Sequence, residues 1–146
     1  LNWMLFGAGV LARGERARAL ELLWFIQRYL IRFARLLEGT TEHWQTPSKA
    51  LERDLSSAAY DRYVATTASL RGHELEHAYQ AAWNWGVEMA HKLREAYGVN
   101  IKEDLIAELS GRLTCWLKAE EQSRHIHKAY TQKGTEDGRP DHGASA

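Results

Sequence analysis

Two histidines lie four residues apart in the segment His73-Glu74-Leu75-Glu76-His77, and an acidic residue directly follows the first of them. On a helix, residues i and i+4 share one face, so this spacing suits a zinc site with Glu74 as general base. However, Glu76 occupies a position that zinc proteases usually keep uncharged, and no glycine-spaced third histidine follows. A third ligand would have to come from another element, with His43 as the candidate. The alternative is the polar first turn of a helix, where the helix dipole favours acidic side chains, and we assign no metal ligand.

Four arginines, Arg18, Arg28, Arg32 and Arg35, follow one line of a strongly helical segment. Guanidinium groups bind phosphate and carboxylate through paired hydrogen bonds, so Arg28, Arg32 and Arg35 are candidates for an anion site. The alternative is the solvated face of a helix that is apolar on its other sides. We favour this alternative, because a central helix needs a polar strip for solubility.

A third group combines aromatic rings with one carboxylate. It comprises Tyr79, Trp83, Trp85 and Glu88 in one helical segment, and His43 and Trp44 in a loop. Rings cover the apolar faces of sugars and a carboxylate pairs with an amine, so the group predicts a site for a small cationic or sugar-bearing molecule. Their spacing places Trp85 and Glu88 on adjacent edges of one helical turn. The alternative is that the same rings serve two helix packings or a dimer contact.

The motifs of phosphoryl and acyl transfer are missing from the sequence. It has no glycine-rich phosphate loop and no G-x-S-x-G, and its five aspartates form no D-x-D pair able to hold magnesium. The lone Cys115 is expected to be a quiet buried thiol. We therefore assign no catalytic residue and no cofactor to this chain.

These groups need helices to position them. The chain has 146 residues, 45% of them hydrophobic, and only two prolines, so little interrupts a helix. Apolar residues recur at helical spacing, and no alternating strand pattern of useful length appears. The expected helices cover residues 2–11, 15–38, 47–55, a short segment capped by Ser57, 73–97 and 102–121. Gly39 and Gly98 are the expected C-terminal stops.

These segments predict an all-α bundle of five to six helices, with two long helices that are roughly antiparallel. We expect one helical bundle domain over residues 1–130. Residues 131–146 consist largely of polar residues and glycine and are expected to form a disordered tail.

The composition excludes several classes of partner. Lys and Arg total 19, as do Asp and Glu, so the net charge is zero and no nucleic-acid partner is expected. No apolar run reaches the ~18 residues of a membrane span. A single cysteine and the lack of signal-peptide features at the start predict a cytoplasmic location. The first helix presents Trp3, Phe6 and Val10 with no element to cover them, which predicts a homodimer.

A series of short motifs runs nearly collinearly from residue 1 to about residue 117. They are Met4-Leu5-Phe6-Gly7-Ala8, Arg13-Gly14-Glu15, Ala17-Arg18-Ala19-Leu20, Glu38-Gly39, His43-Trp44, Thr46-Pro47-Ser48, Ala50-Leu51-Glu52, Asp54-Leu55-Ser56, Tyr60, Arg62-Tyr63, Ala78-Tyr79, Trp83, Trp85 and Glu88. Together they resemble the C-terminal half of lincosamide nucleotidyltransferases, a family similar to the kanamycin nucleotidyltransferases.

The resemblance implies a helical domain that helps to hold an antibiotic. Members of the family adenylylate a drug hydroxyl with ATP and magnesium, tend to be homodimers, and carry their G-S and D-x-D motifs in an N-terminal catalytic domain. This chain has neither motif, and His73 and His77 are not part of the family pattern. The resemblance therefore implies a non-catalytic substrate-binding domain that binds a small molecule or a partner chain, with ATP and magnesium involved only if a catalytic domain is joined to it.

Two alternatives remain open. One is a stand-alone interaction protein that pairs with a separate nucleotidyltransferase, as in toxin–antitoxin pairs. The other is a metal-dependent hydrolase built on a helical bundle, with the histidine pair at its centre.

Overall fold

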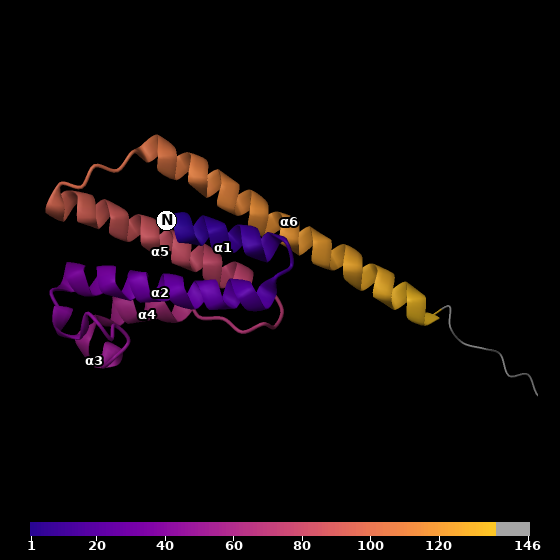
Figure 1. The fold of residues 1–146 in the computed structure, drawn as a ribbon, viewed down its shortest axis with the longest axis horizontal. Helices are drawn as coiled ribbons and strands as arrows, with labels where there is room; N and C mark the ends of the chain where they lie inside the picture. The colour runs from indigo at the N-terminus through magenta and orange to yellow at the C-terminus, as the bar shows by residue number, and fades with distance from the viewer. Residues whose placement is uncertain (137–146) are drawn as a thin grey trace, which may run out of the picture.

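The computed structural model describes the backbone of residues 1–136 and the side chains of residues 1–119. Within this part, the chain forms six α-helices and one short 3-10 helix, with no strand (Figure 1). In chain order these are α1 (Asn2–Ala12), α2 (Arg16–Glu38), η1 (Thr41–His43), α3 (Leu51–Asp54), α4 (Ser57–Ala65), α5 (Glu74–Tyr97) and α6 (Glu103–Glu136). The predicted all-α class and number of helices are confirmed.

Helix α2 is central because its apolar stripe packs against both α1 and α5. Leu23, Ile26, Leu30 and Ile31 are buried at the helical spacing that the sequence displays. The helix ends at Gly39, whose φ of 72° lies in the left-handed region that glycine adopts without strain. The expected stop of this helix is therefore confirmed.

Helices α2 and α5 run in the same direction, so the antiparallel arrangement expected of two long helices is not found in this pair. Arg16 at the start of α2 pairs with Glu76 at the start of α5, with 2.7 Å between Nη1 and Oε1. One turn further along each helix, the Tyr79 hydroxyl donates to the carbonyl of Ala19. The segment that includes α3 and α4 returns the chain to the beginning of α2, so α5 repeats the direction of α2 (Figure 1).

Helix α6 is antiparallel to α5. Trp83 Nε1 donates to the Ser110 hydroxyl at 2.9 Å, and Arg94 near the end of α5 pairs with Glu103 at the start of α6. The helix continues beyond the expected end to Glu136, past the other helices, and includes the first residues of the expected tail (Figure 1). Residues 137–146 lie outside the described residues.

Cys115 is exposed on α6, so the expectation of a buried thiol is wrong, because the buried side of this helix passes through Leu113 and Leu117 instead. Among the described residues, every helix is too short or too polar to cross a lipid bilayer.

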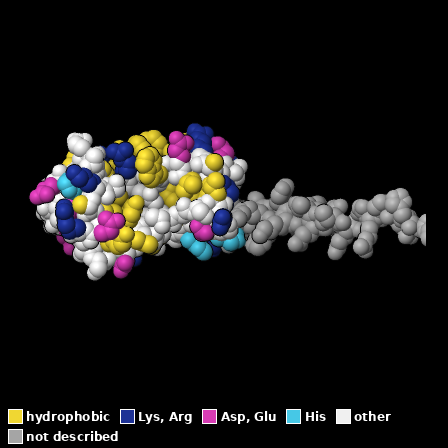
Figure 2. All heavy atoms as spheres, turned by 90° about the horizontal axis from the view of Figure 1, so that it is seen from below, with side chains coloured by type: hydrophobic (Ala, Val, Ile, Leu, Met, Phe, Trp, Pro, Cys, Tyr) yellow, Lys and Arg dark blue, Asp and Glu magenta, His cyan; other side chains and the backbone are white. Residues whose placement is uncertain are grey.

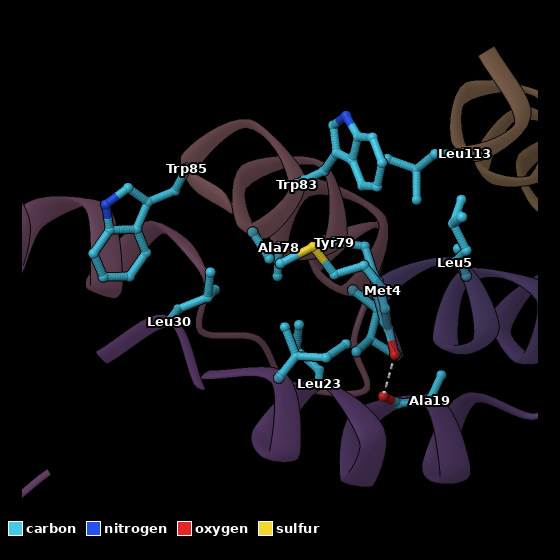
Figure 3. Packing of buried hydrophobic residues seen from close by; sticks show 14 of the residues in the cluster. Met4, Leu5, Ala19, Leu23, Leu30, Ala78, Tyr79, Trp83, Trp85 and Leu113 are labelled. Carbon is cyan, nitrogen blue, oxygen red and sulfur yellow. Dashed lines mark hydrogen bonds between the residues drawn. The ribbon is translucent and has the colours of Figure 1, made fainter. Parts of the chain in front are cut away.

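Glycines let α1 approach α5 closely. A Cβ added at Gly7 would lie 2.1 Å from the Tyr79 hydroxyl oxygen, and one added at Gly86 would lie 2.9 Å from the Met4 methyl. Tyr79 is fully buried, and its hydroxyl points to α2, where it meets Ala19 (Figure 3). Close packing of α1 against α5 therefore depends on glycine at positions 7 and 86.

The segment between α2 and α5 differs from its predicted form at two points. Residues 47–50 form turns, and α3 begins only at Leu51, so Pro47 is not the first residue of a helix. Helix α4 is capped by Ser56, not Ser57, because the Ser56 hydroxyl accepts from the Ala59 amide at 3.2 Å. The Glu38 carboxylate in turn accepts hydrogen bonds from the amide and hydroxyl of Ser56, which joins this cap to the end of α2.

Candidate functional site

The two histidines of the H-E-x-x-H segment lie at the start of α5, where His73 is the N-cap residue and His77 is exposed. The second acidic residue, Glu76, is buried and pairs with Arg16 of α2. Glu74 accepts a hydrogen bond from the Ser69 amide. In the part of the chain that the structure describes, three or more His, Cys, Asp or Glu side chains do not gather into a possible metal site.

Arg35 is fully buried, and it is neither a solvated residue nor an open anion site. Its Nε donates to the Pro47 carbonyl at 2.9 Å, Nη2 to the Lys49 carbonyl at 2.6 Å, and Nη1 to the Thr40 carbonyl at 3.0 Å. Nη1 also donates to Asp54 Oδ2 at 3.1 Å. Arg35 therefore fixes the segment between α2 and α4, and both sequence interpretations of this residue are wrong.

Burial acts to raise the pKa of the Asp54 carboxyl group. The hydrogen bonds from Arg35 and Arg53 act in the opposite direction and outweigh it, so this pKa lies below its ordinary value. Asp54 is therefore ionised near neutral pH, as a partner of Arg35 has to be.

The other arginines of the line do not converge on a common point. Arg18 pairs with Glu15 and lies over the Phe6 ring, while Arg28 is exposed and lines a shallow hollow with Gln45 and Ser48. The Nε atom of Arg32 donates to the Trp44 carbonyl, and its guanidinium lies over the rings of Tyr29 and Trp44. Arg28, Arg32 and Arg35 thus have separate surroundings, and they do not form one anion site.

Four of the six residues expected around the small-molecule site lie elsewhere. Tyr79 and Trp83 are core residues, and the Tyr79 hydroxyl donates to the Ala19 carbonyl of α2 (Figure 3). Trp83 Nε1 donates to the Ser110 hydroxyl of α6. His43 lies in η1 with its Nε2 3.7 Å from Asp54 Oδ2, and Trp44 packs under Arg32. The expected cleft is not assembled, because adjacent rings of α5 point to different neighbouring helices.

Trp85 and Glu88 do share a hollow, as their spacing predicts. It has a volume of about 320 Å³ and lies between α2, α4 and α5; we call it the Glu88 hollow. Its polar lining comprises Glu38, Ser56, Arg62, Glu88 and Lys92, and its apolar lining comprises Ala34, Leu37, Ala58, Ala59, Trp85 and Met89. In Figure 3, Trp85 points away from Trp83 and Tyr79, on the opposite side of α5.

The carboxylate of Glu88 is held in its ionised form. Lys92 Nζ lies 2.8 Å from Oε1, and Arg62 Nη2 lies 3.1 Å from Oε2. The hydrogen bond from Lys92 is the largest influence and lowers the pKa of Glu88 below its ordinary value. Both cationic partners are exposed, so a ligand cation can replace Lys92 or Arg62 at the Glu88 carboxylate.

A second, larger hollow is almost entirely apolar. It has a volume of about 590 Å³ between the start of α1, the second half of α2 and the end of α5, and we call it the apolar groove. Trp3, Tyr29, Phe33, Leu93 and Tyr97 are among its walls. The sequence offered a signal for it in the apolar residues all round α2, which exceed the needs of one core.

The groove continues into a row of exposed rings on α1 and α2. We call this row the aromatic stripe: Trp3, Phe6, Phe25, Tyr29 and Phe33, each 40–50% exposed. Val10 is fully buried, contrary to expectation, while Trp3 and Phe6 are exposed as predicted. Apolar side chains also reach the surface between charged groups on the face in Figure 2.

A search of curated proteins found no significant match to the chain. The comparison with protein families gives a clear result, and it agrees with the motifs that run through α1, the α2–α4 segment and α5. Residues 1–112 match the family described as "Lincosamide nucleotidyltransferase-like, C-terminal domain", and the chain therefore belongs to this family.

Proposed function

We propose that this helical domain binds a small cationic, sugar-bearing molecule of the lincosamide kind in the Glu88 hollow, without carrying out catalysis itself. The observation that carries the proposal is the ionised Glu88 carboxylate beside Trp85 at the wall of a concave surface. An ammonium group pairs with such a carboxylate, and the ring edge and the neighbouring apolar side chains cover a sugar face.

Exchange of partners makes this chemistry feasible. Lys92 and Arg62 are both exposed, so they return to water when a ligand amine replaces them at Glu88. Binding therefore leaves no buried charge without a partner. A buried, unpaired charge would oppose binding. Glu38 adds a second carboxylate to the wall, although its two oxygens already accept from Ser56.

The absence of catalysis is part of the proposal and rests on the sequence. Adenylyl transfer needs carboxylates that hold magnesium, and no D-x-D pair occurs among the 146 residues. ATP and magnesium would act only on a catalytic domain joined or paired to this one. A cytoplasmic location fits the single cysteine, because reducing compartments leave thiols unpaired.

Calorimetry with lincomycin tests the binding proposal on wild type and two matched variants. Glu88→Gln removes a carboxylate that lines the hollow and pairs with Lys92, four positions along α5. Glu108→Gln removes a carboxylate outside the hollow that pairs with Arg112, four positions along α6. We expect weak saturable binding that falls at least roughly tenfold in Glu88→Gln, because the lower end of what a hydrogen bond to a charged group contributes is about 1.5 kcal/mol. Glu108→Gln should bind like wild type. Equal affinities of all three proteins would place the ligand elsewhere.

Incubation of the chain with ATP, magnesium and lincomycin tests the absence of catalysis. We expect no adenylylated drug by mass spectrometry. Any such product from clean protein, above a blank without protein, would disprove this part of the proposal.

The apolar groove favours a second function, pairing with a nucleotidyltransferase domain or chain. Its wall offers rings and aliphatic side chains with few polar groups, which suits a protein surface better than a sugar-bearing drug. A titration with a nucleotidyltransferase that carries the D-x-D motif, followed by sedimentation, tests it. Val99→Glu at the groove should weaken the complex, and a complex unaffected by this change would refute the assignment of the groove.

A further inference from the structure

Trp24 of α2 is the most exposed large apolar side chain in the described part of the chain, at 65%. It forms a common wall of two neighbouring hollows, with volumes of about 190 Å³ and about 430 Å³. Among the described residues, one charged side chain lines each hollow, and we name them the Arg28 hollow and the Glu21 hollow. The ring of Trp24 therefore stands in water between a cation and an anion.

The guanidinium of Arg28 has no hydrogen-bond or ion-pair partner among the described residues. By contrast, Arg32 donates to the Trp44 carbonyl and Arg35 to backbone carbonyls of the segment after α2. The Arg28 hollow is also lined by Gln45 and Ser48, whose side chains are likewise unpaired in this part of the chain. One hollow thus carries a guanidinium, an amide and a hydroxyl whose donors the described chain does not use.

The loop wall of the Arg28 hollow is fixed from behind by a buried side chain. The carbonyls on either side of Ser48, those of Pro47 and Lys49, accept from Arg35 at 2.9 Å and 2.6 Å. Arg35 is fully buried, so these bonds are shielded from water. The Ser48 hydroxyl therefore starts from an ordered backbone, which reduces the entropy lost when a ligand binds.

Gln27 lines both hollows and is only 7% exposed. Its Nε2 donates to the Thr66 carbonyl at 2.7 Å, which fixes the amide and leaves Oε1 without a donor among the described residues. The Glu21 carboxylate is also unpaired there. Unused acceptors thus lie on the Glu21 side of Trp24, whereas unused donors lie on the Arg28 side.

We propose that the two hollows bind a phosphate monoester that carries a planar ring, with the phosphate at Arg28 and the ring on Trp24. A phosphate offers three strong acceptor oxygens, which match the guanidinium, the Ser48 hydroxyl and the Gln45 amide. The exposed indole stacks on a planar ring, as aromatic side chains do on many ring-bearing ligands.

The charges along α2 determine how this ligand is oriented. Glu21, Trp24 and Arg28 are three and four residues apart, so they follow one face of the helix. Glu21 and Arg28 are separated by about 10 Å along the axis, which leaves room for a ring beside a phosphate. Glu21 repels the phosphate from its own hollow and accepts from an amino or hydroxyl group on the ring. None of these three residues lines the Glu88 hollow or the apolar groove, so the inference does not depend on the proposed ligand site.

Calorimetry of the full chain with phenyl phosphate at low salt tests the phosphate position. Arg28→Gln removes the guanidinium, and Arg18→Gln makes the same change on the same helix outside both hollows. We expect weak saturable binding that falls at least about tenfold in Arg28→Gln, the loss of a hydrogen bond between charged groups. Arg18→Gln should bind like wild type, and an equal loss in both variants would mean that only the general charge of the chain matters and would overturn the proposal.

The ring position is tested with Trp24→Ala and with Phe25→Ala as its control, since Phe25 is the next ring along α2 and lines neither hollow. Trp24→Ala should weaken phenyl phosphate binding about 2–10-fold, the contribution of one aromatic pair, and Phe25→Ala should not weaken it. Inorganic phosphate, which has no ring, should bind wild type more weakly than phenyl phosphate by a similar factor. Equal binding of the two phosphates would refute the role of Trp24.

Two further outcomes would overturn the proposal. One is a chain that shows no saturable binding of phenyl phosphate, and the other is unchanged affinity in Arg28→Gln while circular dichroism shows the variant folded. Saturating lincomycin separates this site from the Glu88 hollow, because it should leave the affinity for phenyl phosphate unchanged. Competition between the two molecules would place the phosphate elsewhere and refute the site at Arg28.

Discussion

Replacement of Arg35 by methionine tests the claim that a buried guanidinium fixes the segment between α2 and α4. Methionine keeps most of the apolar stem but removes all the donors. The carbonyls of Thr40, Pro47 and Lys49 then lose their partner at once. The same change removes the close cation from Asp54.

The magnitude follows from these contacts. A buried acceptor left without a donor costs about 1–3 kcal/mol, and three carbonyls are affected. Water reaches part of this segment once it loosens, which limits the total. We therefore expect Arg35→Met to lower the free energy of unfolding by about 3–5 kcal/mol, as the loss of one partner from a buried ionic network does.

Urea unfolding followed by circular dichroism measures this loss, with Arg53→Met as the matched control. Arg53 pairs with the same carboxylate, Asp54, but its side chain is exposed and bonds none of the three carbonyls. Its replacement should leave the midpoint nearly unchanged, because exposed ion pairs contribute little. If the two variants unfold at the same urea concentration with equal slopes, the stabilising role of Arg35 is refuted.

Three further results are expected. Gly7→Ala should lower the free energy of unfolding by about 1–3 kcal/mol, because the added methyl would meet the buried Tyr79 ring. Gly111→Ala, with open space around it, should raise the free energy of unfolding by up to about 1 kcal/mol. Thermal melts in which both variants shift the melting temperature in the same direction would contradict this packing. Burial raises the pKa of Tyr79, so above about pH 10 the unfolded chain releases a proton that the native state keeps, and stability present below that pH is lost. Urea midpoints at pH 8 and 10.5 should therefore fall less in Tyr79→Phe than in wild type, and equal falls would contradict it. The Lys92 ammonium lowers the pKa of Glu88, so lincomycin affinity measured by calorimetry should stay constant as pH falls from 6.5 to 5 and decline only below about 4.5; a decline centred above pH 5 would exclude Glu88 as the amine partner.

The sequence predicts α2 and α5 because each repeats apolar residues at helical spacing and ends at a glycine, Gly39 and Gly98. It does not predict their relative direction. That direction depends on where the α3–α4 segment leads the chain, and the segment is fixed by hydrogen bonds from Arg35 to carbonyls that leave no mark in the sequence. Arginine is almost never fully buried unless paired, so periodicity alone placed this residue in water.

The candidate site was predictable only in part, for a similar reason. Trp85 and Glu88 lie three residues apart on one helix, so their proximity follows from local geometry. Trp83 and Tyr79 do not join Trp85 and Glu88, because each donates a hydrogen bond to another helix. Trp83 donates to Ser110 of α6, and Tyr79 donates to Ala19 of α2. A single sequence shows which residues share a helix but not which neighbour each ring finds.

Val10 illustrates the same limit on α1. It shares a helical face with Trp3 and Phe6, and the sequence offers no reason to treat it differently. In the structure the second half of α1 is enclosed by its neighbours, and Trp116 of α6 lies against Gly9, where an added Cβ would be 3.6 Å from the ring. The first half has no such cover, so exposure changes along a single face within two turns.

Helix α2 separates what the fold needs from what binding needs. Arg35 makes its contacts within the chain, so its replacement should lower the free energy of unfolding without altering the aromatic stripe. Phe25 and Tyr29 make edge contacts with other exposed rings and leave much of their apolar surface in water, which adds little to the free energy of folding. An isolated fold gains nothing from such exposure, and in soluble proteins it marks surfaces that meet a partner. Phe25→Ser should therefore leave the urea midpoint nearly unchanged, whereas Arg35→Met should lower it, and a reversal of these two results would mean that the rings serve folding after all.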